Sequence, residues 1–328
     1  MKVASFFSGI GGFDLGFQKA NFEVTMQCEI DPFCNQILEK HWPGVKRFDD
    51  IRKVSHGDVP LADVWAAGFP CQDVSLARMG PRAGLKGKKS GLFYEFARLL
   101  RDGCPRVVVI ENVPGLLSSH GGRDFQIVIR TLADIGYGVG WRVLNSKNFG
   151  VPQSRQRVFI VGSYRDWRTP AEILFKRQRG KGDTEEDGSN GQKPLSPFKE
   201  SLGDLIKGPV VQRLAYCLYA CSARHTGTDW SRTYVTYPDG RVRRLTPDEC
   251  ERIQGFPPDW TLPPEPPEDV NALDTLRYTC LGNAVTAAVA EWIAVRIRDS
   301  LATQSIANEL KKVLPIRVIA ASARAAQA

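Results

Sequence analysis

Two residues of this 328-residue chain are suited to covalent and acid–base chemistry, a cysteine and a glutamate that each follow an apolar run. Cys71 lies in Gly-Phe-Pro-Cys-Gln (68–72) after the mostly apolar residues 63–67, and Glu111 follows the mostly apolar residues 106–110. Such runs predict buried strands, so the thiol and the carboxyl group would lie at strand ends that can face one pocket. Taken alone, a cysteine is more often a small buried apolar residue, and a glutamate after a strand is more often solvated.

Five motifs, in order along the chain, make the sequence resemble the DNA cytosine-5 methyltransferases of bacterial restriction-modification systems. They are Phe-Ser-Gly-Ile-Gly-Gly (7–12), Gly-Phe-Pro-Cys-Gln (68–72), Glu-Asn-Val (111–113), Gln-Ser-Arg-Gln-Arg (153–157) and Gly-Asn-Ala-Val (282–285). The resemblance extends from Phe6 to about Arg296. It leaves out residues 163–244 and the C-terminal tail.

This resemblance implies a catalytic set in which Cys71, followed by Gln72, adds as a thiolate to ring carbon 6 of cytosine and activates ring carbon 5. Glu111 would hold ring nitrogen 3 and the exocyclic amine and supply a proton. Arg157 would reach the carbonyl oxygen of the base, and Arg155 would lie beside the thiolate. No metal is needed for this chemistry.

A glycine-rich turn between a strand and a helix, residues 7–12, predicts a nucleotide site because the backbone can approach a ligand there. Glu29 closes the next strand about 20 residues after Gly9, where a carboxylate can bind ribose hydroxyls. A nicotinamide cofactor would fit these residues equally well, but the resemblance implies S-adenosyl-L-methionine, with S-adenosyl-L-homocysteine as the product. The predicted cofactor residues are Phe7, Gly9, Ile10, Gly11, Gly12, Glu29, Ile30, Asp50, Ile51, Pro70, Leu92, Asn283 and Ala284.

Strand-like and helix-like runs alternate along the first half of the chain, which predicts a doubly wound α/β fold of the Rossmann-like methyltransferase type. The candidate residues fall at the carboxyl ends of the predicted strands, which form one crevice in an open parallel sheet. We expect a catalytic and cofactor-binding domain that begins with residues 1–162 and returns with residues 245–300. Residues 163–244 would form a smaller, mostly β target-recognition domain, and residues 301–328 a C-terminal helix and tail.

Positive charge is concentrated in two segments, which suggests a polyanion held at two places. Residues 70–90 contain five Lys or Arg against one Asp, and residues 163–244 contain fifteen against ten acidic residues, within a chain of net charge +8. Because a cytosine inside a duplex is inaccessible, the base would have to be flipped out, and the basic loop after Cys71 could close over it. The predicted DNA-binding residues are Ser75, Arg78, Arg82, Lys86, Lys88, Lys89, Arg224, His225 and Arg232.

The sequence departs from the resembled family at two positions. Cys217-Leu218 stands in place of the usual Thr-Leu pair of the recognition domain, and Ala284 stands in place of a serine. Three competing functions remain open at this point: a tRNA cytosine-5 methyltransferase, a catalytically inactive DNA-binding relative, and a nicotinamide dehydrogenase. The basic insert favours DNA over tRNA, and the presence of Cys71 and Glu111 argues against the other two.

Other features indicate a soluble cytoplasmic protein. The eight cysteines include no Cys-x-x-Cys pair and the four histidines lie far apart, so we predict no zinc site. No signal-peptide pattern begins the chain, and no apolar run approaches the roughly 18 residues of a membrane span. The resemblance implies duplex DNA as the substrate and either a cognate restriction endonuclease on a separate chain or an orphan methylase. We expect a monomer that acts on chromosomal DNA.

Overall fold

The computed structural model describes residues 1–70, 90–175, 209–220 and 232–313. Cys71 and Gln72 lie outside these residues, as do eight of the predicted DNA-binding residues: Ser75, Arg78, Arg82, Lys86, Lys88, Lys89, Arg224 and His225. Arg232 is described.

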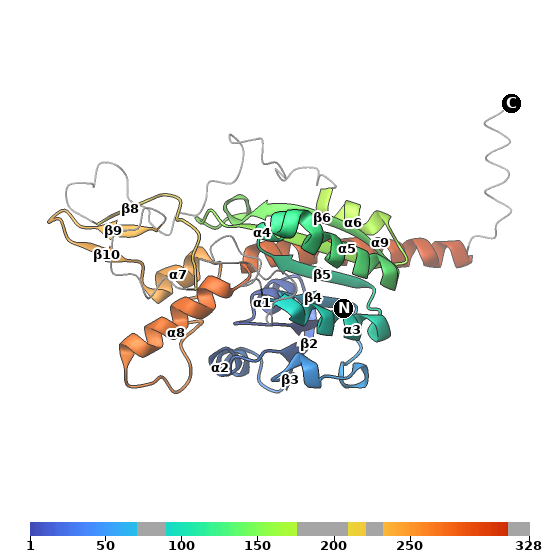
Figure 1. Ribbon diagram of the computed structural model, residues 1–328, viewed down its shortest axis with the longest axis horizontal. Coiled ribbons are helices and arrows are strands. Elements are labelled where there is room, and N and C mark those ends of the chain that lie inside the picture. Colours follow the sequence, from blue (N-terminus) through green and yellow to red (C-terminus); the bar gives the residue numbers. More distant parts are fainter. Residues whose placement is uncertain (71–89, 176–208, 221–231, 314–328) are drawn as a thin grey trace, which may run out of the picture.

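A seven-stranded sheet forms the centre of the protein, with strand order β3-β2-β1-β4-β5-β7-β6 (Figure 1). Neighbouring strands are parallel from β3 to β5, whereas β7 and β6 pair antiparallel. The strands are β1 (Lys2–Phe6), β2 (Glu23–Cys28), β3 (Lys46–Phe48), β4 (Val64–Ala67), β5 (Val107–Asn112), β6 (Tyr137–Asn145) and β7 (Gln156–Tyr164). The helices of this body are α1 (Gly12–Lys19), α2 (Pro32–His41), α3 (Phe93–Gly103), α4 (Gly115–Ser118), α5 (Arg123–Ile135), α6 (Arg168–Phe175) and α9 (Ala287–Val313).

Both faces of the sheet are covered, which is why its central strands contain continuous apolar runs such as residues 64–67 and 107–110. Val107 and Val109 of β5 belong to a core shared with α1, α2, α6 and α9, while Val108 and Ile110 belong to a second core shared with α3 and α5. Successive side chains of a strand point to opposite faces, so one strand serves both cores. The predicted doubly wound α/β fold is confirmed.

The C-terminal part of the chain returns to this body through close contact between α1 and the start of α9. A Cβ atom at Gly12 would lie 2.2 Å from the Val285 carbonyl oxygen, and one at Gly16 would lie 2.5 Å from the Ala290 Cβ. Glycine at both positions therefore lets the two helices approach backbone to backbone. This packing seats residues 282–285 beside the glycine-rich turn.

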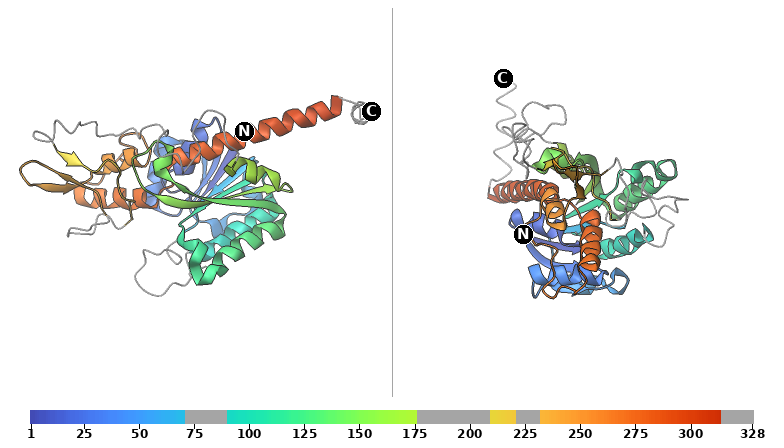
Figure 2. Two further views of the ribbon diagram at one scale, coloured as in Figure 1. Left: turned by 90° about the horizontal axis from the view of Figure 1, so that it is seen from above. Right: turned by 90° about the vertical axis from the view of Figure 1, so that its left-hand side faces the viewer.

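A smaller three-stranded sheet lies at one end of the molecule, and α9 extends beyond the body at the other (Figures 1 and 2). The strands of this small sheet are β8 (Val210–Val211), β9 (Tyr234–Thr236) and β10 (Val242–Arg244). They pair antiparallel in the order β10-β9-β8. Helices α7 (Pro247–Ile253) and α8 (Val270–Asn283) follow it. Helix α7 begins after Thr246, which forms a capping box with Glu249.

One predicted boundary differs from the structure. The predicted start of the recognition domain at residue 163 falls inside β7, and α6 then packs on β6 and α9 because Ile173 and Leu174 complete the core of the body. We therefore place the end of the first part of the body at Phe175. Within the described residues 212–220, only Ala215 pairs with another strand-like residue, through an isolated bridge to Gln153.

One helical stretch among the described residues, Val270–Ile306, is long and apolar enough to cross a membrane by length and composition alone. It comprises α8 and part of α9 and is interrupted at residues 284–286, and 67% of its most apolar window is buried inside the protein. The sequence predicted no apolar run of this length. The buried core helices of a soluble protein pass the same test.

Candidate active site

A cavity of about 420 Å³ opens at the carboxyl ends of the parallel strands. Residues that follow β1, β2 and β4 line it, together with the end of β5, the start of β7 and the last turns of α8. The lining residues are Phe7, Gly9, Cys28, Glu29, Ile30, Asp31, Phe33, Cys34, Asp49, Asp50, Ile51, Arg52, Gly68, Phe69, Pro70, Leu92, Glu111, Val113, Arg155, Arg157, Leu276, Thr279, Cys280, Gly282 and Asn283.

Glu111 and Arg157 form an ion pair in one half of this cavity. The Arg157 Nε lies 3.0 Å from the Glu111 Oε1, and both side chains are largely buried. Burial raises the pKa of the Glu111 carboxyl group above its usual value, and the neighbouring Arg157 and Arg155 guanidinium groups partly offset this rise. A buried carboxyl group that is easier to protonate than usual is suited to giving a proton to a bound base.

The backbone that leads to Cys71 runs past this carboxyl group. The Asn112 side-chain amide donates to the Phe69 carbonyl oxygen at 3.1 Å, which ties the segment after β4 to the end of β5. A Cβ atom at Gly68 would lie 3.7 Å from the Glu111 Oε2. Pro70, the last described residue before Cys71, also lines the cavity. The chain therefore reaches residue 70 at the edge of the cavity that holds Glu111.

Arg155 lines the same cavity, but its described partners are mainly backbone carbonyl groups. It is 1% exposed. Nη1 donates to the Leu218 carbonyl oxygen at 2.9 Å, and Nη2 donates to the carbonyl oxygens of Gly282 at 3.0 Å and Ala284 at 2.8 Å. The predicted position of Arg155 beside the Cys71 thiolate involves a residue outside the described part of the chain and stays a prediction.

The other half of the cavity is built on the glycine-rich turn. Phe7 and Gly9 line it, and both have positive φ angles, 56° and 55°. Such an angle is unusual for a bulky residue, and at Gly9 a Cβ atom would meet nothing within 4 Å. The Glu29 carboxylate accepts hydrogen bonds from the backbone amides of Gly9 at 2.7 Å and Asp31 at 2.8 Å. Burial raises the pKa of Glu29.

Asp50 and Ile51 follow β3, as the sequence predicted, and the cavity includes both. The Arg52 side chain, which donates hydrogen bonds to the Asp50 carboxylate, lowers the pKa of Asp50. Ile51 is buried, whereas Ile30 is 63% exposed. An acidic group next to apolar side chains suits a flat heterocycle that carries an amine.

Four predicted cofactor residues do not line the cavity. The Ile10 side chain is wholly buried in the core, and Gly11 and Gly12 pack against Trp42 and Val285. Ala284 is buried and presents its carbonyl oxygen to Arg155. These four residues form the support of the turn and of the α8 end.

Of the α8 residues that line the cavity, the sequence predicted Asn283, but Leu276, Thr279 and Cys280 were missed. Positions separated by three, four and seven residues share one face of a helix, so a helical reading of residues 270–283 with Asn283 as the anchor would have found them. No sequence motif marked three other residues that line the cavity, Cys28, Cys34 and Arg52.

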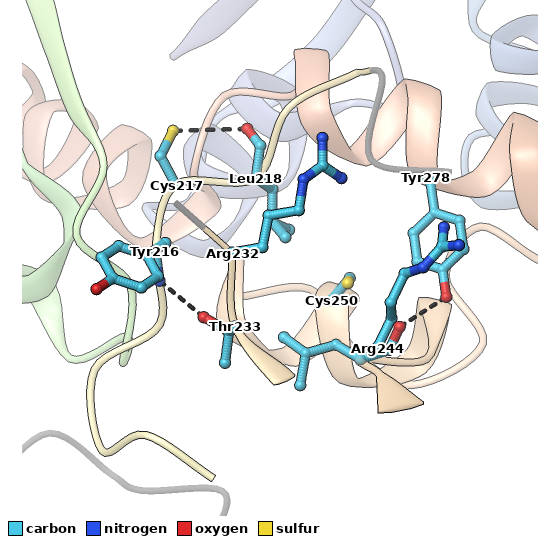
Figure 3. Close-up of a pocket in the computed structure, with 9 residues that line it drawn as sticks. Tyr216, Cys217, Leu218, Arg232, Thr233, Arg244, Cys250 and Tyr278 are labelled. Atoms are coloured by element: carbon cyan, nitrogen blue, oxygen red, sulfur yellow. Dashed lines mark hydrogen bonds between the residues drawn. The ribbon is translucent and has the colours of Figure 1, made fainter. Parts of the chain in front are cut away.

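A second, smaller pocket of about 40 Å³ lies between the three-stranded sheet and α7 and α8 (Figure 3). Figure 3 shows the side chains of Arg232 and Arg244 on its rim, with Tyr278 beside Arg244. Cys217 and Leu218 lie on the side of this pocket that leads to Arg155. Arg232 is the one predicted DNA-binding residue that falls within the described ranges, and it lies at this rim.

Comparison with known proteins gives a consistent identity. The model of the C-5 cytosine-specific DNA methylase family matches residues 1–216 and 211–299. Type II methyltransferase M2.BsuMI of Bacillus subtilis is 32% identical over 302 residues, which is 89% of this chain and 74% of that protein. M.Bsp6I of a Bacillus species is 30% identical over 322 residues, which is 92% of this chain and 99% of that protein.

Solved structures agree in fold. A mutant of Spodoptera frugiperda DNMT2 has a TM-score of 0.67 at 17% identity and covers 90% of this chain and 99% of its own. The Entamoeba histolytica methyltransferase EhMeth has a TM-score of 0.64 at 19% identity and covers 92% of this chain and 98% of its own. At these identities the likeness shows the fold alone. The family match and the relatives do not favour the tRNA alternative, and the chain belongs to the C-5 cytosine-specific DNA methylase family as a DNA cytosine-5 methyltransferase.

Proposed function

We propose that the cavity of this DNA cytosine-5 methyltransferase binds S-adenosyl-L-methionine along β1 to β3 and a flipped-out cytosine beside Glu111. The donor set supports the cofactor assignment: Glu29 offers carboxylate oxygens for ribose hydroxyls, Asp50 can accept from the adenine amine, and Ile51 supplies an apolar contact. Gly9 leaves the backbone open to a ligand. When bound, the cofactor supplies an electrophilic methyl group.

The observation that carries the proposed mechanism is the Glu111–Arg157 pair beside the segment that leads to Cys71. Cys71 would add as a thiolate to ring carbon 6 while the Glu111 carboxyl group gives its proton to ring nitrogen 3. Ring carbon 5 then carries the electron pair that would form the new carbon–carbon bond to the methyl group, with S-adenosyl-L-homocysteine as the leaving group. Loss of the proton from carbon 5 to water would return its electrons to the ring and release the Cys71 thiolate, and ring nitrogen 3 would return its proton to Glu111. Arg157 would hold the carbonyl oxygen of the base.

We further propose that the three-stranded sheet and the segments around it bind the duplex. Arg232 lies at the rim of the pocket in Figure 3 together with Arg244, so two cations face one place where DNA could lie. Extraction of the cytosine costs stacking and pairing energy. Binding should therefore tighten in the order matched, mismatched and abasic opposite the target cytosine, measured with S-adenosyl-L-homocysteine at fixed salt. Equal affinity for the three duplexes would argue against flipping.

The biological setting is also a proposal. We infer a monomer in the cytoplasm that methylates chromosomal DNA, either with a cognate restriction endonuclease on a separate chain or as an orphan methylase. The relatives that support this setting are Type II methyltransferases.

Bisulfite sequencing of host DNA, with and without expression of the chain, tests the activity and gives the target sequence. Expression of the parent should protect cytosines at one short sequence from conversion, whereas Cys71→Ser and Glu111→Gln should not. Cys104→Ser is the matched control, because Cys104 is a free cysteine at the end of α3, outside the cavity lining.

A duplex with 5-fluorocytosine at that target then tests the covalent step. The parent should form a stable adduct because fluorine cannot leave as a cation, and Cys71→Ser should form none. A stable adduct with Cys71→Ser, or none with the parent, would remove Cys71 from the mechanism.

A further inference from the structure

Arg155 is the largest fully buried side chain of the described residues. Its guanidinium group joins two segments that are distant in sequence, since Nη1 bonds the Leu218 carbonyl oxygen and Nη2 bonds those of Gly282 and Ala284. The planar guanidinium presents its donors in a fixed fork. One rigid group therefore bonds both segments.

The first segment, residues 215–220, follows β8 and is attached to the large sheet domain by hydrogen bonds. The Leu218 amide donates to the Gln153 Oε1 at 3.1 Å, and Gln153 is fully buried. The amide of Ala215 donates to the Pro152 carbonyl oxygen at 2.8 Å. Residues 152–155 therefore hold this segment in place through hydrogen bonds to Ala215 and Leu218.

The second segment is the end of α8, and it belongs to the cofactor cavity. Gly282 and Asn283 line that cavity. The same end of α8 touches residues 219–220 directly, because a Cβ atom at Gly282 would lie 2.2 Å from the Ala220 amide nitrogen. The Thr279 hydroxyl donates to the Ala220 carbonyl oxygen at 3.1 Å. Arg155 is the side chain that bonds both segments at once.

We propose that Arg155 is a positioning residue that couples occupancy of the cofactor cavity to the order of residues 215–220. A ligand that contacts Gly282 and Asn283 restrains the end of α8, and the Arg155 guanidinium passes this restraint to Leu218. A ligand that rigidifies one element lowers the entropic cost of ordering a neighbour that is bonded to it. Residues 215–220 would then be best ordered when the cofactor is present. The inference rests on the proposed cofactor site.

Hydrogen exchange of peptides that cover residues 209–220 tests this coupling, with and without saturating S-adenosyl-L-homocysteine. In the parent, the ligand should slow exchange of the Ala215 and Leu218 amides by roughly tenfold. In Arg155→Lys the ligand should leave their exchange within about twofold, because an ammonium group cannot hold carbonyl groups of both segments in the same geometry. Calorimetric titration of the same samples with S-adenosyl-L-homocysteine measures whether the ligand is bound.

Arg296→Lys is the matched control. Arg296 is also buried and donates to two backbone carbonyl groups, those of Glu172 and Ile173 at the end of α6, away from the cavity. A merely structural loss should lower stability in both variants, but only Arg155→Lys should lose the ligand-dependent protection. Protection that persists in Arg155→Lys, or is lost equally in Arg296→Lys, would overturn the coupling role.

If Arg155→Lys does not fold, hydrogen exchange of the parent protein alone still tests the coupling. A parent that binds S-adenosyl-L-homocysteine without any change in exchange at residues 215–220 would overturn the coupling and leave the cofactor site intact. A parent that binds no S-adenosyl-L-homocysteine would overturn the cofactor assignment as well.

Discussion

The two halves of the cavity are assembled in different ways. The half along β1 to β3 is made mainly of strand ends and turns between residues 7 and 51, with the end of α8 beside them, and Glu29 accepts hydrogen bonds from the nearby amides of Gly9 and Asp31. The half around Glu111 combines side chains from segments far apart in sequence, and its acid is paired with Arg157 of β7. The first half therefore depends mainly on local strand–turn geometry, and the second requires the whole fold.

Two buried carboxyl groups, one beneath the glycine-rich turn and one at Glu111, have different neighbours. Asp14 of α1 lies beneath the glycine-rich turn and accepts hydrogen bonds from the neutral side chains of Ser5 and Gln27. Glu111 faces the cations Arg155 and Arg157. Burial raises the pKa of both groups, but only Glu111 is open to the cavity, where a change of protonation can act on a substrate. Asp14 has a structural role, because its carboxyl group links Ser5 of β1 to Gln27 of β2 through hydrogen bonds.

The largest expected effect is on catalysis. Glu111→Gln keeps the shape of the side chain but removes the ion pair and the proton donor, so turnover should fall by a factor on the order of 100 or more. Affinity for S-adenosyl-L-homocysteine should be nearly unchanged, because the other half of the cavity is intact. Methyl transfer to the target duplex and calorimetric titration measure the two quantities. Asp124→Asn, which alters a buried carboxyl group of α5 outside the cavity lining, should leave both unchanged; equal losses in the two variants would contradict the role of Glu111.

The second effect concerns stability and pH. Burial raises the pKa of Asp14 from 3.8 to about 6, so ionisation of this group weakens the folded state as pH rises through this interval, and below it the penalty is absent. Asn cannot ionise. Relative to the parent, Asp14→Asn should therefore gain about 2 kcal/mol in free energy of unfolding between pH 4.5 and 7.5.

Urea unfolding at both pH values measures this difference. Asp134→Asn is the control, because that side chain is 72% exposed, and it should show no such gain. A pH-independent difference between Asp14→Asn and the parent would mean that Asp14 does not have a raised pKa in the folded state.

A smaller effect, on ligand affinity, should follow a substitution in the half along β1 to β3. Glu29→Ala removes the carboxylate that holds the Gly9 amide and that would bind the ribose, so affinity for S-adenosyl-L-homocysteine should fall by roughly tenfold, the equivalent of one lost hydrogen bond. Turnover at saturating cofactor should change less than in Glu111→Gln. Glu23→Ala, at the exposed start of the same strand, should bind like the parent. If Glu29→Ala lowers turnover without weakening binding, the assignment of the two halves is wrong.

Sequence reasoning predicted the strand ends because its cues are local. Glycine turns and apolar runs each depend on a few neighbouring residues, and Glu29, Asp50 and Glu111 all line the cavity. The same reasoning predicted Ile10, Gly11 and Gly12 as cofactor residues, and these are not among the residues that line the cavity. A motif fixes where the chain turns, but not which of its side chains face the ligand.

The partners of Arg155 could not be predicted, because they are backbone carbonyl groups of segments 63 to 129 residues away. A carbonyl group has no sequence signature. The boundary after Phe175 was missed for a related reason, since α6 is placed by its packing on β6 and α9. Residue types predicted the chemistry of this half, and only the folded chain gives its connections.

The smallest expected effect tests the departure from the family at Cys217. Its Sγ lies 3.4 Å from the Arg155 Nη1 and is a weak acceptor. Threonine, the usual residue of the family at this place, would offer a hydroxyl oxygen to the same guanidinium while adding a methyl group beside Leu218. Cys217→Thr should therefore keep turnover within a few-fold and change the free energy of unfolding by at most about 1 kcal/mol, the net value of one hydrogen bond. Cys217→Val, which has the shape of threonine without its acceptor, is the matched control and should be the less stable of the two in thermal unfolding. Equal stability of the two variants would mean that the contact between residue 217 and Arg155 contributes nothing, and that the segment is held by its other hydrogen bonds, among them those of Leu218 to Gln153 and Arg155.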